Sequence, residues 1–248
     1  MRHNPNVIRL VVGNETIFRH EHTAAEIAKI VRRVKQESPV PVATADNWKT
    51  FIDHPELVDA VDQVFAHIIP YWEGLPQKSA VKGSLAIYDR LRAAYPGKKI
   101  VIGEFGWPSA GHNFERAVPG PFSQAALLRD FVAEADALGI DYNIVEAIDQ
   151  PEKVFEGNVG PYWGILDASL RPKFAWTGPL VDTGISSKGN KISDSPSVLI
   201  CRRECPNYVN FFEVSNIDHY VGQPTCQSSA HPLNGMEQHH AATPFHSD

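Results

Sequence analysis

Two glutamates each follow an apolar segment of the chain, and this pattern predicts a pair of catalytic carboxylates. Glu15 ends the segment Ile8–Glu15, and Glu104 ends the segment Ile100–Glu104, in which Gly103 precedes the acid. Both segments are typical of buried parallel strands, whose carboxyl ends meet at the edge where α/β enzymes keep their chemistry. Retaining glycoside hydrolysis needs two carboxyl groups about 5–5.5 Å apart, one protonated and one ionised. For either glutamate alone, a salt-bridged acid at the rim of the sheet is the alternative.

Composition and charge narrow the class of protein. The chain has 248 residues, 43% hydrophobic and 21% charged, with a formal net charge of -6. These values are ordinary for a globular protein and give no basic footprint for nucleic acid. No run approaches the ~20 apolar residues of a membrane-spanning helix, and no signal-peptide pattern opens the chain, so we expect no membrane segment and leave the compartment and the oligomeric state open. No cofactor is expected, since two carboxylates suffice for the proposed chemistry.

Hydrophobic periodicity predicts strands that alternate with helices. The strands are expected at Val7–Val12, Val40–Ala45, Val64–Ile69, Ile100–Gly103 and Tyr142–Ala147. Helices are expected from the capping box Thr23-Ala-Ala-Glu26 to Ser38, from about Pro55, at Ser79–Ala94 and at Ser123–Leu138, where Gly139 is a C-terminal cap. Repeated βα units imply right-handed crossovers and a parallel sheet.

Five strands fit two α/β architectures. One is an open sheet, and the other is a TIM (β/α)8-type barrel that is incomplete, with its first three βα units missing. We favour the incomplete barrel, because carboxylate and aromatic residues stand at nearly every strand end. Residues 1–182 are then predicted to form the catalytic domain, with an irregular tail over residues 183–248.

The tail holds the three cysteines of the chain. Cys201, Cys205 and Cys226 could join His219 in a zinc set, but their spacing matches no common zinc-binding motif. We therefore predict no metal site.

Two motifs together resemble glycoside hydrolase family 17, the β-1,3-glucanases and β-1,3-glucanosyltransferases. They are Val11-Val-Gly-Asn-Glu15 and Gly103-Glu-Phe-Gly-Trp-Pro-Ser109. In that family the first motif ends barrel strand four and carries the acid/base, and the second ends strand seven and carries the nucleophile. The resemblance implies that Glu15 is the acid/base, that Glu104 is the nucleophile, and that Asn14 binds the sugar 2-hydroxyl. The five strands would be numbers four to eight.

Three further segments extend the resemblance over residues 5–180. They are His67–Trp72, Val145–Asp149 followed by Lys153, and Trp163–Asp167. The resemblance implies that Tyr71 sits near the nucleophile and keeps it ionised. The expected substrate-binding residues are Asn14, Tyr71, Trp72, Trp107, Glu146, Lys153 and Trp163.

Alternatives remain open for several of these residues. The aromatic residues, with Trp48 among them, are either stacking platforms for glucose rings or hydrophobic loop anchors. Glu146 either contacts sugar or pairs with Lys153, and His67 is expected to be a hydrogen-bonded core residue.

The resemblance implies a retaining glycoside hydrolase that acts on β-1,3-glucan by double displacement. The alternatives are a β-1,3-glucanosyltransferase, in which a glucan replaces water as the acceptor, and an inactive, truncated remnant that binds glucan. Without the first three units, two strand edges would stay open and the cleft would be half built, so we expect poor stability.

Overall fold

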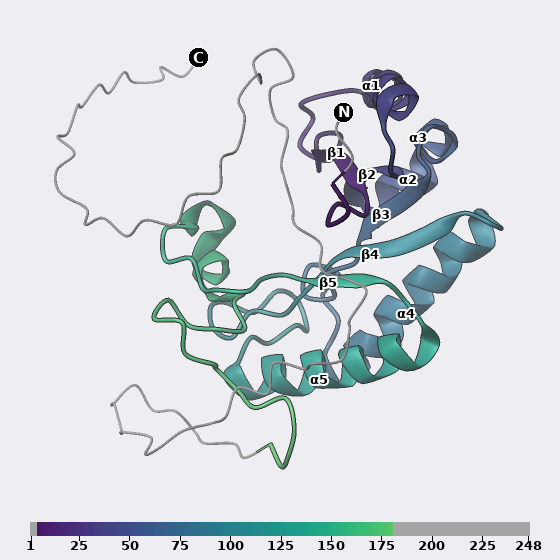
Figure 1. Ribbon diagram of the computed structural model, residues 1–248. Coiled ribbons are helices and arrows are strands. Elements are labelled where there is room, and N and C mark those ends of the chain that lie inside the picture. The colour runs from purple at the N-terminus through teal and green to yellow at the C-terminus, as the bar shows by residue number, and fades with distance from the viewer. Residues whose placement is uncertain (1–3, 181–248) are drawn as a thin grey trace, which may run out of the picture. The chain divides into compact units, whose positions relative to one another are not determined.

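A computed structural model describes residues 4–180, in which strands and helices alternate (Figure 1). The strands are β1 (Leu10–Asn14), β2 (Val42–Asn47), β3 (Gln63–His67), β4 (Lys99–Phe105) and β5 (Tyr142–Ile144). The helices are α1 (Ala24–Glu37), α2 (Trp48–Asp53), α3 (Pro55–Ala60), α4 (Gln77–Ala94), α5 (Pro121–Leu138) and the 3₁₀ segment η1 (Val154–Tyr162). The predicted tail and the cysteine set with His219 lie outside the described residues.

The five strands form one parallel sheet in the order β1-β2-β3-β4-β5, which confirms the predicted parallel α/β arrangement. Each strand lies beside the next one in the sequence, so every connection is a crossover to the adjacent position. β1 and β5 are the edge strands of this sheet. All five strands were predicted in place, but none with both ends exact: the largest differences are at β1, which starts at Leu10 and runs to Asn14, and at β5, which stops at Ile144.

Side chains on the two faces of the sheet form separate clusters. One face contributes Val42, Val64, Ile100 and Ile102 to a large core that includes residues of all five α-helices. The other face carries a small cluster of strand residues alone, namely Ala43, Ala45, Phe65 and Val101, with Val11 packed against it. The helices therefore cover one face, and the opposite face is filled only by the strands.

Local signals fix several helix ends. The Thr23 side chain and Glu26 form the predicted capping box of α1, and Gly139 ends α5 with a left-handed φ of 65°. Helix α2 was not predicted; it begins directly after β2 because the Asn47 side chain accepts a hydrogen bond from the amide of Lys49. The 3₁₀ segment η1 was also missed. Among residues 4–180, no helix combines the length and apolar character needed to cross a bilayer.

Candidate active site

The carboxyl ends of three strands bring Glu15, His67 and Glu104 together. Glu15 directly follows β1, His67 is the last residue of β3, and Glu104 is near the end of β4. His67 and Glu104 are partners in the parallel register of β3 and β4. Strands β2 and β3 lie between β1 and β4, so the strand order itself places His67 of β3 between the two glutamates.

The two carboxylates are close enough to act on one atom. One oxygen of each glutamate and a ring nitrogen of His67 all lie within 4.8 Å of one another. His67 Nδ1 is 2.8 Å from Glu15 Oε1 and 3.5 Å from Glu104 Oε2. Both carboxylate side chains keep about a quarter of their surface exposed, at 24% and 23%, whereas the His67 side chain is 1% exposed. A ligand can therefore reach the glutamates but not the ring.

The backbone around Glu15 is held in an unusual conformation. Gly13 has a φ of 77° and Glu15 a φ of 54°, and the β1–β2 register shifts between Val11 and Asn14. A positive φ is uncommon outside glycine and is often found at functional sites. The amide of Glu15 donates to the carbonyl of Ala45 at 2.8 Å, which fixes the turn against β2.

The buried side chain of Asp46 holds the loop that follows Glu15. Its Oδ2 accepts hydrogen bonds from the amides of Ile17 at 3.1 Å and Phe18 at 3.4 Å, and its Oδ1 accepts from Thr50 Oγ1 at 2.8 Å. Asp46 follows the predicted strand Val40–Ala45 and was not among the predicted site residues. Nothing local in the sequence shows that it binds a loop 28 residues away.

The electrostatics of the three residues are coupled. Burial alone would raise the pKa of Glu15, but the hydrogen bond and charge of His67 outweigh it, so the pKa is lowered. Burial dominates at Glu104 and raises its pKa, although His67 acts in the opposite direction. Burial would lower the pKa of His67, but the hydrogen bond to Glu15 and the charge of Glu104 raise it. A protonated ring thus favours the anion of its nearer neighbour, Glu15.

Asn14 lies beside Glu15 with an unused hydrogen-bonding group. Its side-chain Oδ1 is buried and has no hydrogen-bond partner within the described part of the chain. A buried acceptor without a partner is costly in a protein interior. The amide is therefore available for a hydroxyl donor that would bind next to Glu15.

Four of the predicted aromatic residues, from the loops after β3, β4 and β5, form one cluster. The Tyr71 ring packs edge-to-face against Trp72, Trp107 and Trp163, with centroids 4.7, 5.9 and 5.7 Å away. Trp107 and Trp163 are 0% and 1% exposed, so neither ring leaves a face open to a sugar in this structure, while Trp72 is 37% exposed. Of these three tryptophans, Trp72 alone fits the predicted stacking platform.

The hydroxyl of Tyr71 makes its hydrogen bond away from the glutamates. It donates to the backbone carbonyl of His112 at 2.8 Å, and the residue is fully buried. This bond does not match the expectation that Tyr71 keeps Glu104 ionised. Trp48 is also buried, and its indole N–H donates to Glu73 at 2.8 Å, as expected of a loop anchor.

Glu146 and Lys153 pair with each other, as the structural alternative predicted. Lys153 Nζ lies 3.5 Å from Glu146 Oε2 and 3.0 Å from Glu156 Oε1. Burial raises the pKa of Glu146. The charge of Lys153 also acts on both Glu15 and Glu104, lowering the pKa of each, so this cation belongs to the electrostatic surroundings of the site.

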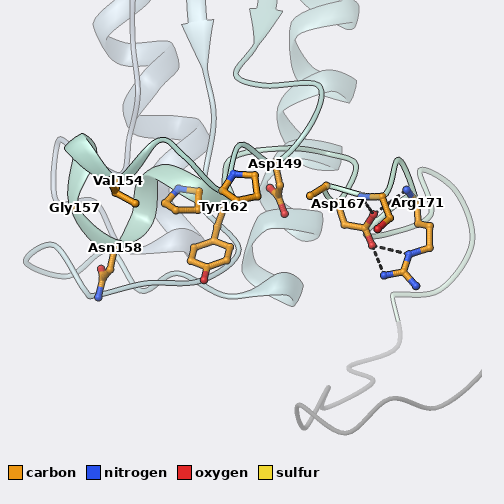
Figure 2. A pocket seen from close by; sticks show the side chains of 11 residues that line it. Asp149, Val154, Gly157, Asn158, Tyr162, Asp167 and Arg171 are labelled. Carbon is orange, nitrogen blue, oxygen red and sulfur yellow. Dashed lines mark hydrogen bonds and ion pairs between the residues drawn. The ribbon is translucent and has the colours of Figure 1, made fainter. Parts of the chain in front are cut away.

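A cavity of about 730 Å³ lies among the loops after β5, and neither Glu15 nor Glu104 lines it (Figure 2). Asp149, Tyr162 and Asn158 line it, as does the ion pair between Asp167 and Arg171 at 2.7 Å. None of the predicted site residues lines this cavity, although Asp149 and Asp167 end two of the segments that extend the family resemblance.

The two glutamates and His67 include the donor atoms of a possible metal centre. Glu15, His67 and Glu104 are residue types that bind metals, and their atoms lie within 4.8 Å of one another. The ring nitrogen that would bind an ion already bonds to Glu15. The expectation that no metal or cofactor takes part stays a prediction.

The comparison with known proteins decides the family. Residues 2–164 match the family described as the BtgE/BtgC glycoside hydrolase domain. The chain belongs to this glycoside hydrolase family. The predicted resemblance to glycoside hydrolase family 17 is confirmed, since the family 17 β-1,3-glucanosyltransferase of Rhizomucor miehei is similar in structure, with a TM-score of 0.63 and 29% identity over 69% of this chain and 64% of that one.

The names of similar proteins are consistent with this family assignment. The chain is 25% identical over 191 residues to the glucan 1,3-beta-glucosidase BGL2 of Candida albicans, covering 66% of this chain and 61% of the relative. It is 30% identical over 193 residues to the "Probable glucan endo-1,3-beta-glucosidase btgC" of Aspergillus fumigatus, covering 66% of this chain and 27% of the relative. The chain thus spans about three fifths of the first relative and a smaller part of the second.

Proposed function

We propose that this chain is the catalytic part of a retaining enzyme that acts on β-1,3-glucan through Glu15 and Glu104. The observation that carries the proposal is the approach of the two carboxylates from β1 and β4 to within 4.8 Å. Retaining enzymes place their carboxyl groups about 5–5.5 Å apart, and inverting enzymes leave a wider gap for water. The names of the relatives and the laminaritriose complex of the similar Rhizomucor miehei enzyme support a β-1,3-glucan substrate.

The reaction would proceed in two displacements. Glu15 gives its proton to the glycosidic oxygen while Glu104 attacks the anomeric carbon, which forms a glycosyl-enzyme and releases one part of the glucan. Glu15 then removes a proton from the acceptor as its oxygen attacks the same carbon and Glu104 leaves. With water as the acceptor the reaction is hydrolysis, and with a glucan hydroxyl it is transfer.

Substrate contacts follow from the surroundings of the pair. Asn14 would accept a hydrogen bond from a sugar hydroxyl through its unpartnered Oδ1, and Trp72 would stack on a glucose ring. Lys153 and Glu146 would contact sugar hydroxyls at the edge of the site while they stay paired. Tyr71, Trp107 and Trp163 would support Trp72 from beneath, since all three are buried.

The fold proposal follows from the strand order. The sequential parallel order, with helices on one face and only strand side chains on the other, supports strands four to eight of a (β/α)8 barrel. A doubly wound open sheet would instead reverse its strand order at a switch point. We accordingly propose residues 1–182 as the catalytic domain.

Product analysis with laminari-oligosaccharides of defined length tests the function. Shorter products alone indicate hydrolysis, and products longer than the substrate indicate transfer. Glu104→Gln should abolish turnover, with a loss of at least about 10⁴-fold, whereas Glu37→Gln at the exposed end of α1 should leave it unchanged. Binding of laminarin with no turnover, unaltered in Glu104→Gln, would instead identify an inactive glucan-binding protein.

A further inference from the structure

The His67 ring connects the two glutamates through one nitrogen. Its Nδ1 lies 2.8 Å from Glu15 and 3.5 Å from Glu104, and its side chain is 1% exposed. We propose that His67 is the positioning residue of this pair: it carries a proton on Nδ1 throughout the reaction, orients Glu15 by a hydrogen bond, and holds both carboxylates at the separation that double displacement requires. This inference rests on the function proposed above and assigns a role to a residue first taken as part of the core.

The two ring nitrogens have different surroundings, which selects the proton position. Nδ1 faces two carboxylates, whereas Nε2 is buried and has no hydrogen-bond partner within residues 4–180. A proton on Nδ1 is shared with an acceptor, while a proton on Nε2 alone would turn the Nδ1 lone pair toward an anion. The arrangement therefore requires Nδ1–H.

The position of the ring depends on a glycine of the second motif. A Cβ added to Gly103 would lie 3.0 Å from Cδ2 of His67 and 3.2 Å from the carbonyl carbon of Phe65. The ring thus lies against the β4 backbone one residue before Glu104. His67 is also the register partner of Glu104. The distance from its ring to that carboxylate is therefore set by the pairing of β3 with β4 and by the lack of a side chain at Gly103.

The His67 ring keeps the same protonation state through both steps of the proposed reaction. When Glu15 has passed its proton to the leaving oxygen, the new carboxylate is stabilised by Nδ1–H of His67, a charge-assisted hydrogen bond. When Glu15 takes the proton of the acceptor in the second step, its other oxygen, Oε2, receives it. His67 itself neither gains nor loses a proton, so no further reactant is needed.

Other charged groups face the same three residues and must be counted in any pH experiment. Asp46 at the end of β2 acts on His67 and raises its pKa. Arg19 and Lys153 act on Glu15, and Lys153 and Glu156 act on Glu104. These groups are left in place in the variants below, so a change in the pH profile reports the ring.

Two variants of His67, compared with a control at His54, separate the hydrogen bond from the charge of the ring. His67→Asn places an amide N–H near the position of Nδ1 without a charge, and His67→Leu removes both. His67→Leu should lower kcat/KM about 10- to 100-fold more than His67→Asn. His54→Asn is the matched control, because His54 Nδ1 also bonds to a glutamate, Glu56 at 3.2 Å, on the exposed surface.

The pH profile distinguishes positioning from packing. Loss of the positive ring raises the pKa of both glutamates, so both limbs of the kcat/KM profile of His67→Asn should move to higher pH. A ring that only fills space would leave both limbs in place while stability fell. Unmoved limbs in a folded His67→Asn protein would therefore overturn the proposal.

A measurement without turnover tests the same claim. In the protein labelled with ¹⁵N-histidine, the His67 resonances should show a protonated Nδ1 across the active pH range, and Glu15→Gln should lower the pH at which the ring loses its charge. A His67 resonance with the proton on Nε2 only would refute the inference. If the wild-type chain released no product from laminari-oligosaccharides, the proposed function would fail, yet this experiment would still decide where the proton lies.

Discussion

Arg9 and Asp141 form an ion pair across the two edges of the sheet, although 132 residues separate them in the sequence. Arg9 directly precedes β1 and Asp141 directly precedes β5, and their Nη2 and Oδ2 atoms are 3.2 Å apart. The guanidinium also lies 5.2 Å from the Phe65 ring centroid, on the face that carries only strand side chains. Charged side chains thus link the edge strands at the amino end of the sheet, opposite the edge that carries Glu15 and Glu104.

Removal of the acid from this ion pair should cost more stability than removal of the base. Asp141→Ala leaves the buried Arg9, 6% exposed, beside an apolar face, and should cost about 3 kcal/mol. Arg9→Met should cost less, because Asp141 keeps Lys99 at 2.6 Å. Urea unfolding measures both, with Arg171→Met of the exposed Asp167 pair as a near-neutral control. Equal losses in the two variants would contradict this prediction.

The same acid should make stability depend on pH. Burial would raise the pKa of Asp141, but the hydrogen bond and charge of Lys99, with the charge of Arg9, lower it. A carboxyl with a lowered pKa in the folded state contributes stability above its unfolded pKa of about 3.9 and loses that contribution as the pH falls through the folded value. The difference in unfolding free energy between wild type and Asp141→Asn should therefore be constant near neutrality and shrink below about pH 4. A difference that grew on acidification would show the opposite linkage.

Local sequence patterns predicted the helices and strands. The alignment of distant strands decided which side chains these elements bring together. The capping box at Thr23 and the glycine cap at Gly139 were predictable because each acts within a few residues. The strand ends at Glu15 and Glu104 were predictable because an apolar run followed by an acid is a local signal. The link from His67 to both acids depends on how β1, β2, β3 and β4 align, and no local pattern contains that alignment.

Burial of aromatic residues was the least predictable part of the site. An indole after a strand end can face a ligand or the core, and the choice depends on neighbours from distant loops. Trp107 and Trp163 are covered because Tyr71 and the loops after β4 and β5 pack on them, whereas Trp72 keeps an exposed surface. Likewise, α2 exists because Asn47 caps it directly at the end of β2, where a loop was the simpler expectation.

Gly106, in the second motif, should not tolerate a side chain. A Cβ there would lie 2.3 Å from the carbonyl oxygen of Val145 and 3.2 Å from the Trp163 ring. Gly106→Ala should destabilise the protein by about 2 kcal/mol or more, because a backbone atom must move. Gly120→Ala is the control, since its nearest neighbour would be 3.6 Å away. Thermal unfolding compares them, and equal melting temperatures would show that the β4–β5 contact can relax.

Trp72 should contribute to substrate binding more than to folding. Its ring is 37% exposed while it packs edge-to-face on Tyr71 at 4.7 Å. Trp72→Ala should raise KM for laminari-oligosaccharides about 10-fold, and Trp72→Phe should recover much of the loss, because a smaller ring can still stack. Trp176→Ala is matched to it, being 42% exposed and edge-to-face with Phe174 at 5.1 Å. A comparable KM increase in Trp176→Ala would show that Trp72 has no specific role in substrate binding.

The pH optimum should lie on the acidic side of neutrality. The proposed first step needs Glu15 protonated and Glu104 ionised, whereas the free protein favours the reverse, since the pKa of Glu15 is lowered and that of Glu104 is raised. With these pKa directions the reactive form is a minor species, and kcat/KM falls below the lower pKa and above the higher one, so the alkaline limb lies at the pKa of Glu104. An aryl glycoside with a good leaving group needs no acid, so with Glu15→Gln its alkaline limb should disappear. An alkaline limb that persists in Glu15→Gln would assign the proton donor to another residue, and Glu104, whose pKa burial raises, would be the first to consider.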